Sequence, residues 1–133
     1  MANSSINYLA GIFDGEGWVS VEKYNRQNNP RYNLCAGVAN TFVPVLEEFK
    51  TRWGGGIYSQ GKHVNLKVWT WRVSSRKAYV FLTNILRYCW IKRPKVEIGI
   101  AYLRGISNYR GYPRVPQEEL DKREAFRQQI MAA

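Results

Sequence analysis

The order of helical and strand patterns along the chain predicts an α+β fold. Apolar residues recur at helical spacing in some segments and alternate with polar residues in others. The helical segments alternate with pairs of strand segments, and no βαβ unit is apparent, which favours antiparallel hairpins. The order α-β-β-α-β-β-α, followed by C-terminal helices, predicts a four-stranded antiparallel sheet with helices on one face and the other face free.

The first three elements are a helix and a hairpin. Serines precede residues 5–15 and can cap a helix there, and the apolar residues that follow have helical spacing. Residues 17–24 and 32–39 alternate, which predicts two strands joined by a polar connector long enough for a loose hairpin. Val19 and Val21 share one side of the first strand, and we expect that side to face the helices.

The second half of the chain repeats this arrangement. The expected elements are a helix over 42–52, strands over 57–60 and 64–73, and a helix over 75–88. Pro94 suits the first turn of a fourth helix, and a charged last helix begins near Pro116. In the second hairpin Lys67, Trp69 and Trp71 share one side, and the pattern leaves open which side faces the helices. We expect residues 1–133 to form a single domain.

The composition of the chain points to a polyanionic partner. The 133 residues contain 20 Lys and Arg against 10 Asp and Glu, a formal charge of +10, and such an excess favours nucleic acid. Two distant cysteines and one histidine argue against a structural zinc site and indicate thiols in a reducing compartment. No run has transmembrane length and no secretory signal is apparent. We therefore expect an intracellular protein with no membrane partner.

Residues 9–17 read LAGIFDGEG, an apolar helix that ends on acids and glycines. Gly11 and Gly15 lie four residues apart, and small residues at that spacing allow two helix backbones to approach closely, within one chain or between two. Glu16 stands at the negative end of the helix dipole, which is an unfavourable place for an acid. An acid there is better explained by another role, such as holding a hard cation with oxygen ligands.

This stretch resembles the signature motif of the LAGLIDADG homing endonucleases, with Ile12 and Phe13 at the Leu-Ile pair, Gly15 in place of Ala, and Glu16 as the last acid. The order of elements over residues 5–90 is also similar to that family's αββαββα fold with its saddle-shaped sheet. The chain has one copy of the motif, like family members that act as homodimers. The resemblance implies an intron-encoded DNA endonuclease that makes a metal-dependent double-strand break with 3′ overhangs at a long, near-palindromic site.

The resemblance also implies roles for individual residues. Two motif helices would pack through Ala10, Gly11, Asp14 and Gly15, with Asp14 supporting the junction by hydrogen bonding. Glu16, with the backbone carbonyl of Gly15, would hold Mg²⁺, and Mn²⁺ or Ca²⁺ can occupy the same site.

Two further residues would assist the reaction. Asn40 would order the attacking water, and Lys92 would activate it or stabilise developing charge. From the residues alone, Asn40 is equally well explained as a helix cap, and Lys92 as a solvated lysine. Lys95 competes with Lys92 because Pro94 leaves the register uncertain.

The free face of the sheet would read double-stranded DNA in the major groove. The residues expected to bind DNA are Trp18, Ser20, Glu22, Tyr24, Arg26, Arg31, Asn33, Lys62, Asn65 and Lys67. The alternative is an intron RNA maturase, or a non-catalytic DNA- or RNA-binding module on the same fold. The host compartment would be an organelle or a microbial or phage-infected cytoplasm.

Overall fold

The computed structural model describes residues 4–26, 29–59, 67–107 and 114–133. Its elements are α1 (Ile6–Glu16), β1 (Gly17–Arg26), β2 (Asn29–Asn40), α2 (Val43–Trp53), β3 (Gly56–Ser59), β4 (Trp69–Ser74), α3 (Ser75–Ile85), η1 (Leu86–Tyr88), α4 (Arg93–Gly105) and α5 (Gln117–Ala132). The predicted order and the α+β class are confirmed. The helix expected to reach residue 88 ends at Ile85, where the chain tightens into the 3₁₀ turn η1.

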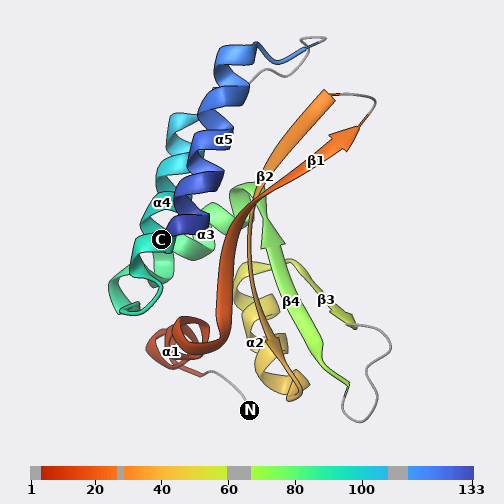
Figure 1. The fold of residues 1–133 in the computed structure, drawn as a ribbon. Helices are drawn as coiled ribbons and strands as arrows, with labels where there is room; N and C mark the ends of the chain where they lie inside the picture. The colour runs from red at the N-terminus through yellow and green to blue at the C-terminus, as the bar shows by residue number, and fades with distance from the viewer. Residues whose placement is uncertain (1–3, 27–28, 60–66, 108–113) are drawn as a thin grey trace.

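The four strands form one antiparallel sheet in the order β1-β2-β4-β3. The helices pack on one side of it: α2 against β3 and β4, α3 against β2 and β4, and α4 and α5 against β1. Figure 1 shows α3, α4 and α5 side by side on the left of the sheet, with α1 below them. The opposite side of the sheet is left without a covering helix among the described residues.

The alternation along the strands fixes which side faces the helices. Val19 and Val21 are buried, as predicted for the helix side of β1. In β4 it is Trp71 that is fully buried, stacked on Phe49 with 4.8 Å between ring centroids. Its Nε1 donates a hydrogen bond of 2.8 Å to the carbonyl of Gly54. The question that the sequence left open is therefore settled. Trp69 and Trp71 face the helices, and Thr70 and Arg72 face away from them.

An aromatic cluster joins the first helix to this core. Phe13 of α1 meets Phe81 of α3 edge to face at 5.0 Å, and Phe81 contacts Trp71 at 4.9 Å. Edge-to-face pairs add to the free energy gained by burying the rings. Leu9 and Ala10 lie on the same buried side of α1 as Phe13. The expectation that Ala10 contributes to a dimer contact is therefore wrong, since this residue is wholly enclosed in its own chain.

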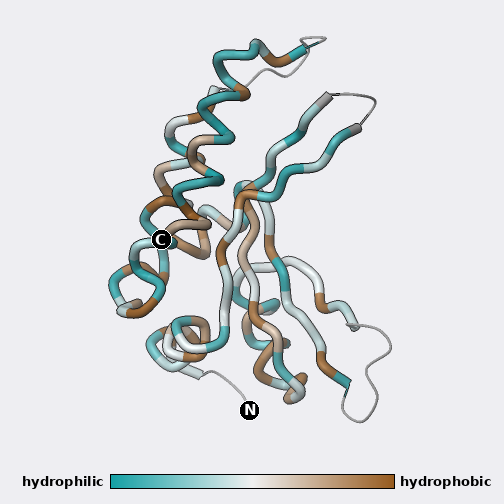
Figure 2. Tube along the Cα trace, viewed as in Figure 1, coloured by the Kyte–Doolittle hydropathy of each residue, from teal (hydrophilic) through white to brown (hydrophobic). Residues whose placement is uncertain are grey.

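The last helix braces the long β1–β2 hairpin from the helix side. Glu124 of α5 accepts a 2.8 Å hydrogen bond from the hydroxyl of Tyr32 and lies 3.4 Å from the ammonium of Lys23. Hydrogen bonds from Gln128 and Tyr32 lower the pKa of Glu124 to about 2. Figure 2 shows polar colour along most of α5 and the outer half of the hairpin. These polar contacts add to the apolar packing of α5, in which Ile130 is buried and Phe126 meets Tyr102 edge to face at 5.6 Å.

Two expectations from composition can also be compared with the structure. Cys35 and Cys89 are both buried and unpaired, as predicted for reduced thiols. Among the described residues, no helix is long and apolar enough to cross a membrane.

Candidate functional site

The motif helix passes directly into the first strand. Glu16 is the last residue of α1 and is exposed, and β1 starts at Gly17. A Cβ at Gly17 would collide with the ring and the carbonyl of Phe13. Glycine is therefore required for the chain to turn from helix to strand without a connector, and Glu16 stands at this turn, on a hollow that borders α1.

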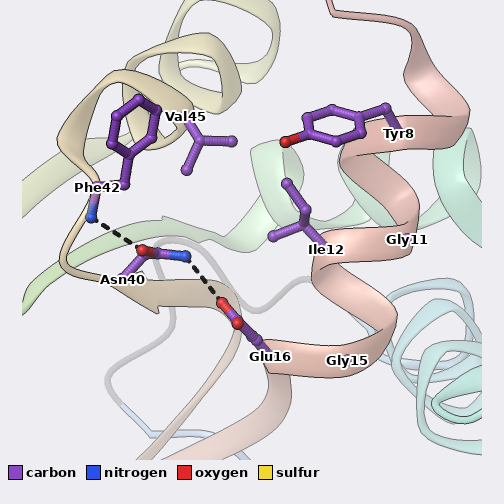
Figure 3. Close-up of a pocket in the computed structure, with 8 residues that line it drawn as sticks. All are labelled: Tyr8, Gly11, Ile12, Gly15, Glu16, Asn40, Phe42 and Val45. Atoms are coloured by element: carbon purple, nitrogen blue, oxygen red, sulfur yellow. Dashed lines mark hydrogen bonds between the residues drawn. The ribbon is translucent and has the colours of Figure 1, made fainter.

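The carboxylate of Glu16 is held by Asn40, the last residue of β2. The Nδ2 of Asn40 donates a 2.9 Å hydrogen bond to Oε2 of Glu16, while its Oδ1 accepts one of 2.9 Å from the amide of Phe42. Figure 3 shows both bonds at the end of the motif helix. Asn40 is not the cap of α2, because the N-cap is Phe42 and has no side-chain cap hydrogen bond. The oxygen of Asn40 instead holds the turn before α2 and its nitrogen faces the acid, while its role in ordering water stays a prediction. The backbone donor fixes which end is the oxygen.

Asp14, two residues before Glu16, is fully engaged within its own chain. Its carboxylate accepts hydrogen bonds from three consecutive amides, those of Trp90 at 3.0 Å, Ile91 at 3.1 Å and Lys92 at 2.8 Å. Burial acts to raise the pKa of this carboxyl, but the three amides outweigh it and hold the pKa below its usual value. The predicted junction with a partner helix is therefore replaced by a junction between α1 and the segment before α4.

The same segment places Lys92 against the motif. The ammonium of Lys92 donates a 2.9 Å hydrogen bond to the backbone carbonyl of Asp14. This carbonyl lies in the last turn of α1, where helical partners run out. Lys95 instead lies with Ser20 and Lys23 of β1 and Arg127 of α5. Of the two candidate lysines, it is Lys92 that lies beside the motif.

The free face of α1 borders a shallow hollow of about 420 Å³. Tyr8, Ile12 and Glu16 line it from α1, and Asn40 and Phe42 line it from the β2–α2 turn, as Figure 3 shows. A Cβ built on either Gly11 or Gly15 would meet no atom within 4 Å. Nothing in the described part of the chain covers these glycines, as expected for a face that receives another helix.

Two large apolar residues extend this exposed surface and were not anticipated from the sequence. Trp90 is 85% exposed and Ile91 is 75% exposed. Their amides are the ones bound by Asp14, so they stand next to α1. The signal available in the sequence was the apolar pair itself, which immediately precedes Lys92 in a break between helices. Large apolar side chains at this exposure commonly mark an interaction surface.

The residues expected to read DNA can now be located on the sheet. Trp18, Ser20 and Glu22 alternate with the buried valines, so they lie on the open side, and Tyr24 continues the row. Arg31 pairs in register with Tyr24, and Asn33 pairs with Glu22. Asn33 Oδ1 accepts a hydrogen bond from the hydroxyl of Ser75. These positions agree with the predicted facing of the first hairpin.

Four of the expected DNA-binding residues cannot be assigned to the open side of the sheet. Lys62 and Asn65 lie outside the described residues, as does the side chain of Arg26. Lys67 precedes β4, and its ammonium lies 5.5 Å from the ring centre of Trp69, a residue of the helix side. The structure thus groups Lys67 with the covered side, while Arg72, which was not predicted, occupies the open side of β4.

The oxygen ligand at the end of α1 is of the type that a hard divalent cation prefers, but the described part of one chain offers too few such ligands to hold it. Glu16 offers an exposed carboxylate, an oxygen ligand of the type that Mg²⁺ and Ca²⁺ prefer. No group of three or more His, Cys, Asp or Glu side chains able to hold a metal occurs within the described ranges. One chain therefore contributes a single carboxylate, and the remaining ligands would come from water, a bound phosphate or a second copy of the chain.

Substitution of Asp14 by Asn should destabilise the fold by about 2 kcal/mol or more at neutral pH, because amide hydrogen bonds to a charged acceptor are lost. A carboxyl with a lowered pKa contributes stability above its unfolded pKa of about 3.9, and this contribution is lost as pH falls through the folded pKa. Urea unfolding is measured from pH 7 to pH 3. The difference in unfolding free energy between wild type and Asp14→Asn should shrink below about pH 4.

Asp121→Asn is the matched control, because Asp121 is exposed on α5 and only accepts a hydrogen bond from Gln117. This variant should differ little from the wild type at any pH. A gap for Asp14→Asn that stays constant with pH would contradict the assignment of a charged, amide-bound carboxylate.

Comparisons with known proteins give a consistent picture of the fold. No protein-family model matches the chain, and neither does any curated protein sequence. Solved structures do match. The homing endonuclease I-CvuI in complex with the I-CreI target is 15% identical, with a TM-score of 0.77 over 96% of this chain and 80% of that chain. The archaeal intron-encoded homing endonuclease I-Vdi141I complexed with DNA is 16% identical, with a TM-score of 0.77 over 96% and 82%.

A third structure matches over less of its own length. The I-LtrWI LAGLIDADG homing endonuclease bound to target DNA is 15% identical, with a TM-score of 0.77 over 97% of this chain and 45% of that chain. At such low identities the likeness shows the fold alone, and it agrees with the resemblance carried by residues 9–17. The chain has the fold of the LAGLIDADG homing endonucleases.

Proposed function

We propose that the protein is a homodimeric, site-specific DNA endonuclease that makes a metal-dependent double-strand break. The observation that carries this proposal is the end of α1, where Asn40 binds the exposed Glu16 carboxylate and the ammonium of Lys92 binds the backbone carbonyl of Asp14. The excess of 20 basic over 10 acidic residues suits a DNA partner. Structures with this fold include several homing endonucleases bound to DNA.

The two acids of the motif have separate roles in this proposal. Asp14 is buried and accepts three hydrogen bonds from backbone amides of its own chain, so it is not presented to a substrate. Glu16 keeps Oε1 for a ligand, because the hydrogen bond from Asn40 goes to Oε2. Each chain thus presents one carboxylate to a divalent cation and the scissile phosphate.

Asn40 and Lys92 would support the hydrolysis of the phosphodiester. A bound Mg²⁺ would lower the pKa of the attacking water and place a positive charge next to the phosphate. Asn40 keeps the Glu16 carboxylate in one rotamer through its Nδ2. Lys92 places a positive charge beside the last turn of α1, where it can stabilise the negative charge that develops on the phosphate oxygens.

A second copy of the chain would complete the enzyme. Gly11 and Gly15 leave the α1 backbone accessible, and Tyr8, Trp90 and Ile91 provide exposed apolar area around it. A two-fold axis through this surface would place the same patch against itself. It would also bring the two Glu16 carboxylates together, one for each DNA strand. Such a dimer would read two inverted half-sites, so the target would be near-palindromic, and we propose short 3′ overhangs from the offset of the two cuts.

Substitution of Glu16 by Gln tests the chemistry. The amide keeps the shape of the side chain but cannot bind a cation as a charged ligand, so cleavage in Mg²⁺ should fall at least about a hundredfold. Binding in Ca²⁺ to a DNA selected from a randomised library should remain within about tenfold of wild type. Cleavage is followed on gels, and binding is followed by fluorescence anisotropy.

Glu47→Gln provides the control. Glu47 is an exposed carboxylate on α2, so this substitution removes the same charge at a position away from the motif. This variant should cut at the wild-type rate. If Glu16→Gln also cuts at that rate, Glu16 is not the metal-binding acid.

Substitution of Gly11 by Leu tests the dimer. A Cβ at this position meets no described atom of its own chain within 4 Å, so each chain should fold normally and its helix should gain intrinsic propensity. A leucine there would hold two α1 backbones apart, so the variant should sediment as a monomer at concentrations where the wild type is a dimer. Ala125→Leu, on the exposed side of α5, should leave the dimer intact. A dimer of unchanged dissociation constant in Gly11→Leu would remove this face from the interface.

A further inference from the structure

Arg72 occupies an unusual place at the centre of the open side of the sheet. Its partner in β2 is Gly37 and its partner in β3 is Gly56. The residues beside an arginine in a sheet normally crowd it with side chains from both neighbouring strands. Here both partners are glycines, and the space above them is filled by the indole of Trp18 at Gly37 and by the hydroxyl of Tyr58 at Gly56.

The guanidinium of Arg72 is held in one orientation by three neighbours. Its Nη2 donates to Oε2 of Glu22 at 2.7 Å and to the sulfur of Cys35 at 3.1 Å. It also lies 5.8 Å from the ring centre of Trp18. The hydrogen bond to Glu22 raises the pKa of Arg72, and burial raises the pKa of Cys35 to about 11, so that Cys35 remains a neutral thiol.

Gly37 is required for this arrangement. A Cβ on Gly37 would run into the ring of Trp18 and the carbonyl of Trp71. The indole of Trp18 therefore lies directly over Gly37 and forms the floor on which the guanidinium rests. A ring that is packed in this way, together with a carboxylate at hydrogen-bond distance, removes rotamer freedom from the arginine before any ligand arrives.

The Nε and Nη1 atoms of the guanidinium are left for a ligand, while Nη2 serves Glu22 and the thiol of Cys35. Within the described ranges, every hydrogen bond of Arg72 leaves from Nη2, and its side chain remains 37% exposed. Residues of three strands surround it in an open hollow of about 450 Å³, namely Trp18, Ser20, Glu22, Tyr58 and Thr70. The hollow is on the side of the sheet without helices, where a duplex would lie.

The chemistry of this hollow favours a nucleobase over a phosphate. The fork of an arginine matches two parallel acceptors, and in the major groove O6 and N7 of guanine form such a pair. A phosphate also fits the fork, but the Glu22 carboxylate 2.7 Å from the guanidinium offsets its charge and repels an anion. A neutral base edge pays no such penalty.

We propose that Arg72, oriented by Glu22 and Trp18, recognises a guanine through O6 and N7, at one base pair in each half of the DNA site. Nη1 and Nη2 form the fork, and the base replaces the weak acceptor Cys35 at Nη2. Glu22 is then a positioning residue rather than a direct reader of bases. This inference rests on the proposed DNA-binding function and adds to it the residue that determines one base of the target.

The decisive experiment measures base preference without cleavage. Wild-type protein and Arg72→Lys are each used to select DNA from a randomised library in Ca²⁺, and the enriched sequences are compared position by position. Lysine keeps the charge but lacks the fork, so the preference for guanine should drop between about fivefold and a hundredfold at one position per half-site. All other positions should stay unchanged, and so should the dependence of affinity on salt. Arg76→Lys, an exposed arginine on α3, should leave the whole profile as it is.

Substitutions of Glu22 separate positioning from simple charge. Glu22→Ala frees the guanidinium and should relax preference at the same base pair, whereas Glu22→Gln keeps an oxygen acceptor and should restore most of it. Melting temperatures of all variants show that they are folded. An unchanged base profile in Arg72→Lys and Glu22→Ala would overturn the inference, and binding of every sequence that tightens in Glu22→Ala would assign Arg72 to a phosphate instead. If the wild type enriches no sequence at all, the proposed function fails, and the inference falls with it.

Discussion

The carboxylate of Asp14 makes the contact on which the rest of the site depends. It joins α1 to a segment 76 to 78 residues later in the chain through three successive amides. Burying a carboxylate without such partners costs several kcal/mol, so the segment before α4 is drawn to the helix end and fixed there. The backbone of this segment then determines where Lys92 and the exposed pair Trp90 and Ile91 can stand.

This arrangement explains why two acids so close in sequence differ in use. Asp14 is enclosed and bound by its own chain, whereas Glu16 leaves the helix on the exposed side and is steadied by a single amide nitrogen of Asn40. The helix-to-strand turn at Gly17 places that second acid on the open hollow beside α1.

Much of the fold could be predicted because each element has its own local pattern. The alternation around Val19 and Val21 fixed the facing of the first hairpin, and Pro94 correctly marked the first turn of α4. The motif identified Glu16, and the family resemblance predicted that Asn40 and Lys92 would assist it. Their hydrogen bonds are consistent with those roles, which stay predictions.

What could not be predicted depends on pairing between distant segments. The environment of Arg72 comes from the register of three strands, which places Gly37 and Gly56 on either side of it. Neither glycine has any local signal that refers to residue 72. Ala10 was misassigned because a small residue suits a helix contact inside the chain as well as one between chains. The partners of Asp14 were missed because amide donors belong to every residue and leave no mark in the sequence.

The symmetry of the recognition surface has an evolutionary consequence. In the proposed pair of identical chains, a mutation at Arg72 would alter two symmetry-related base pairs at once, so a new target would have to change in both halves before it is recognised. Duplication and fusion of the gene would release the halves to diverge independently. The 45% coverage of I-LtrWI leaves room in that chain for a second such unit. As the proposed homodimer, this chain would therefore be confined to targets whose two arms change together.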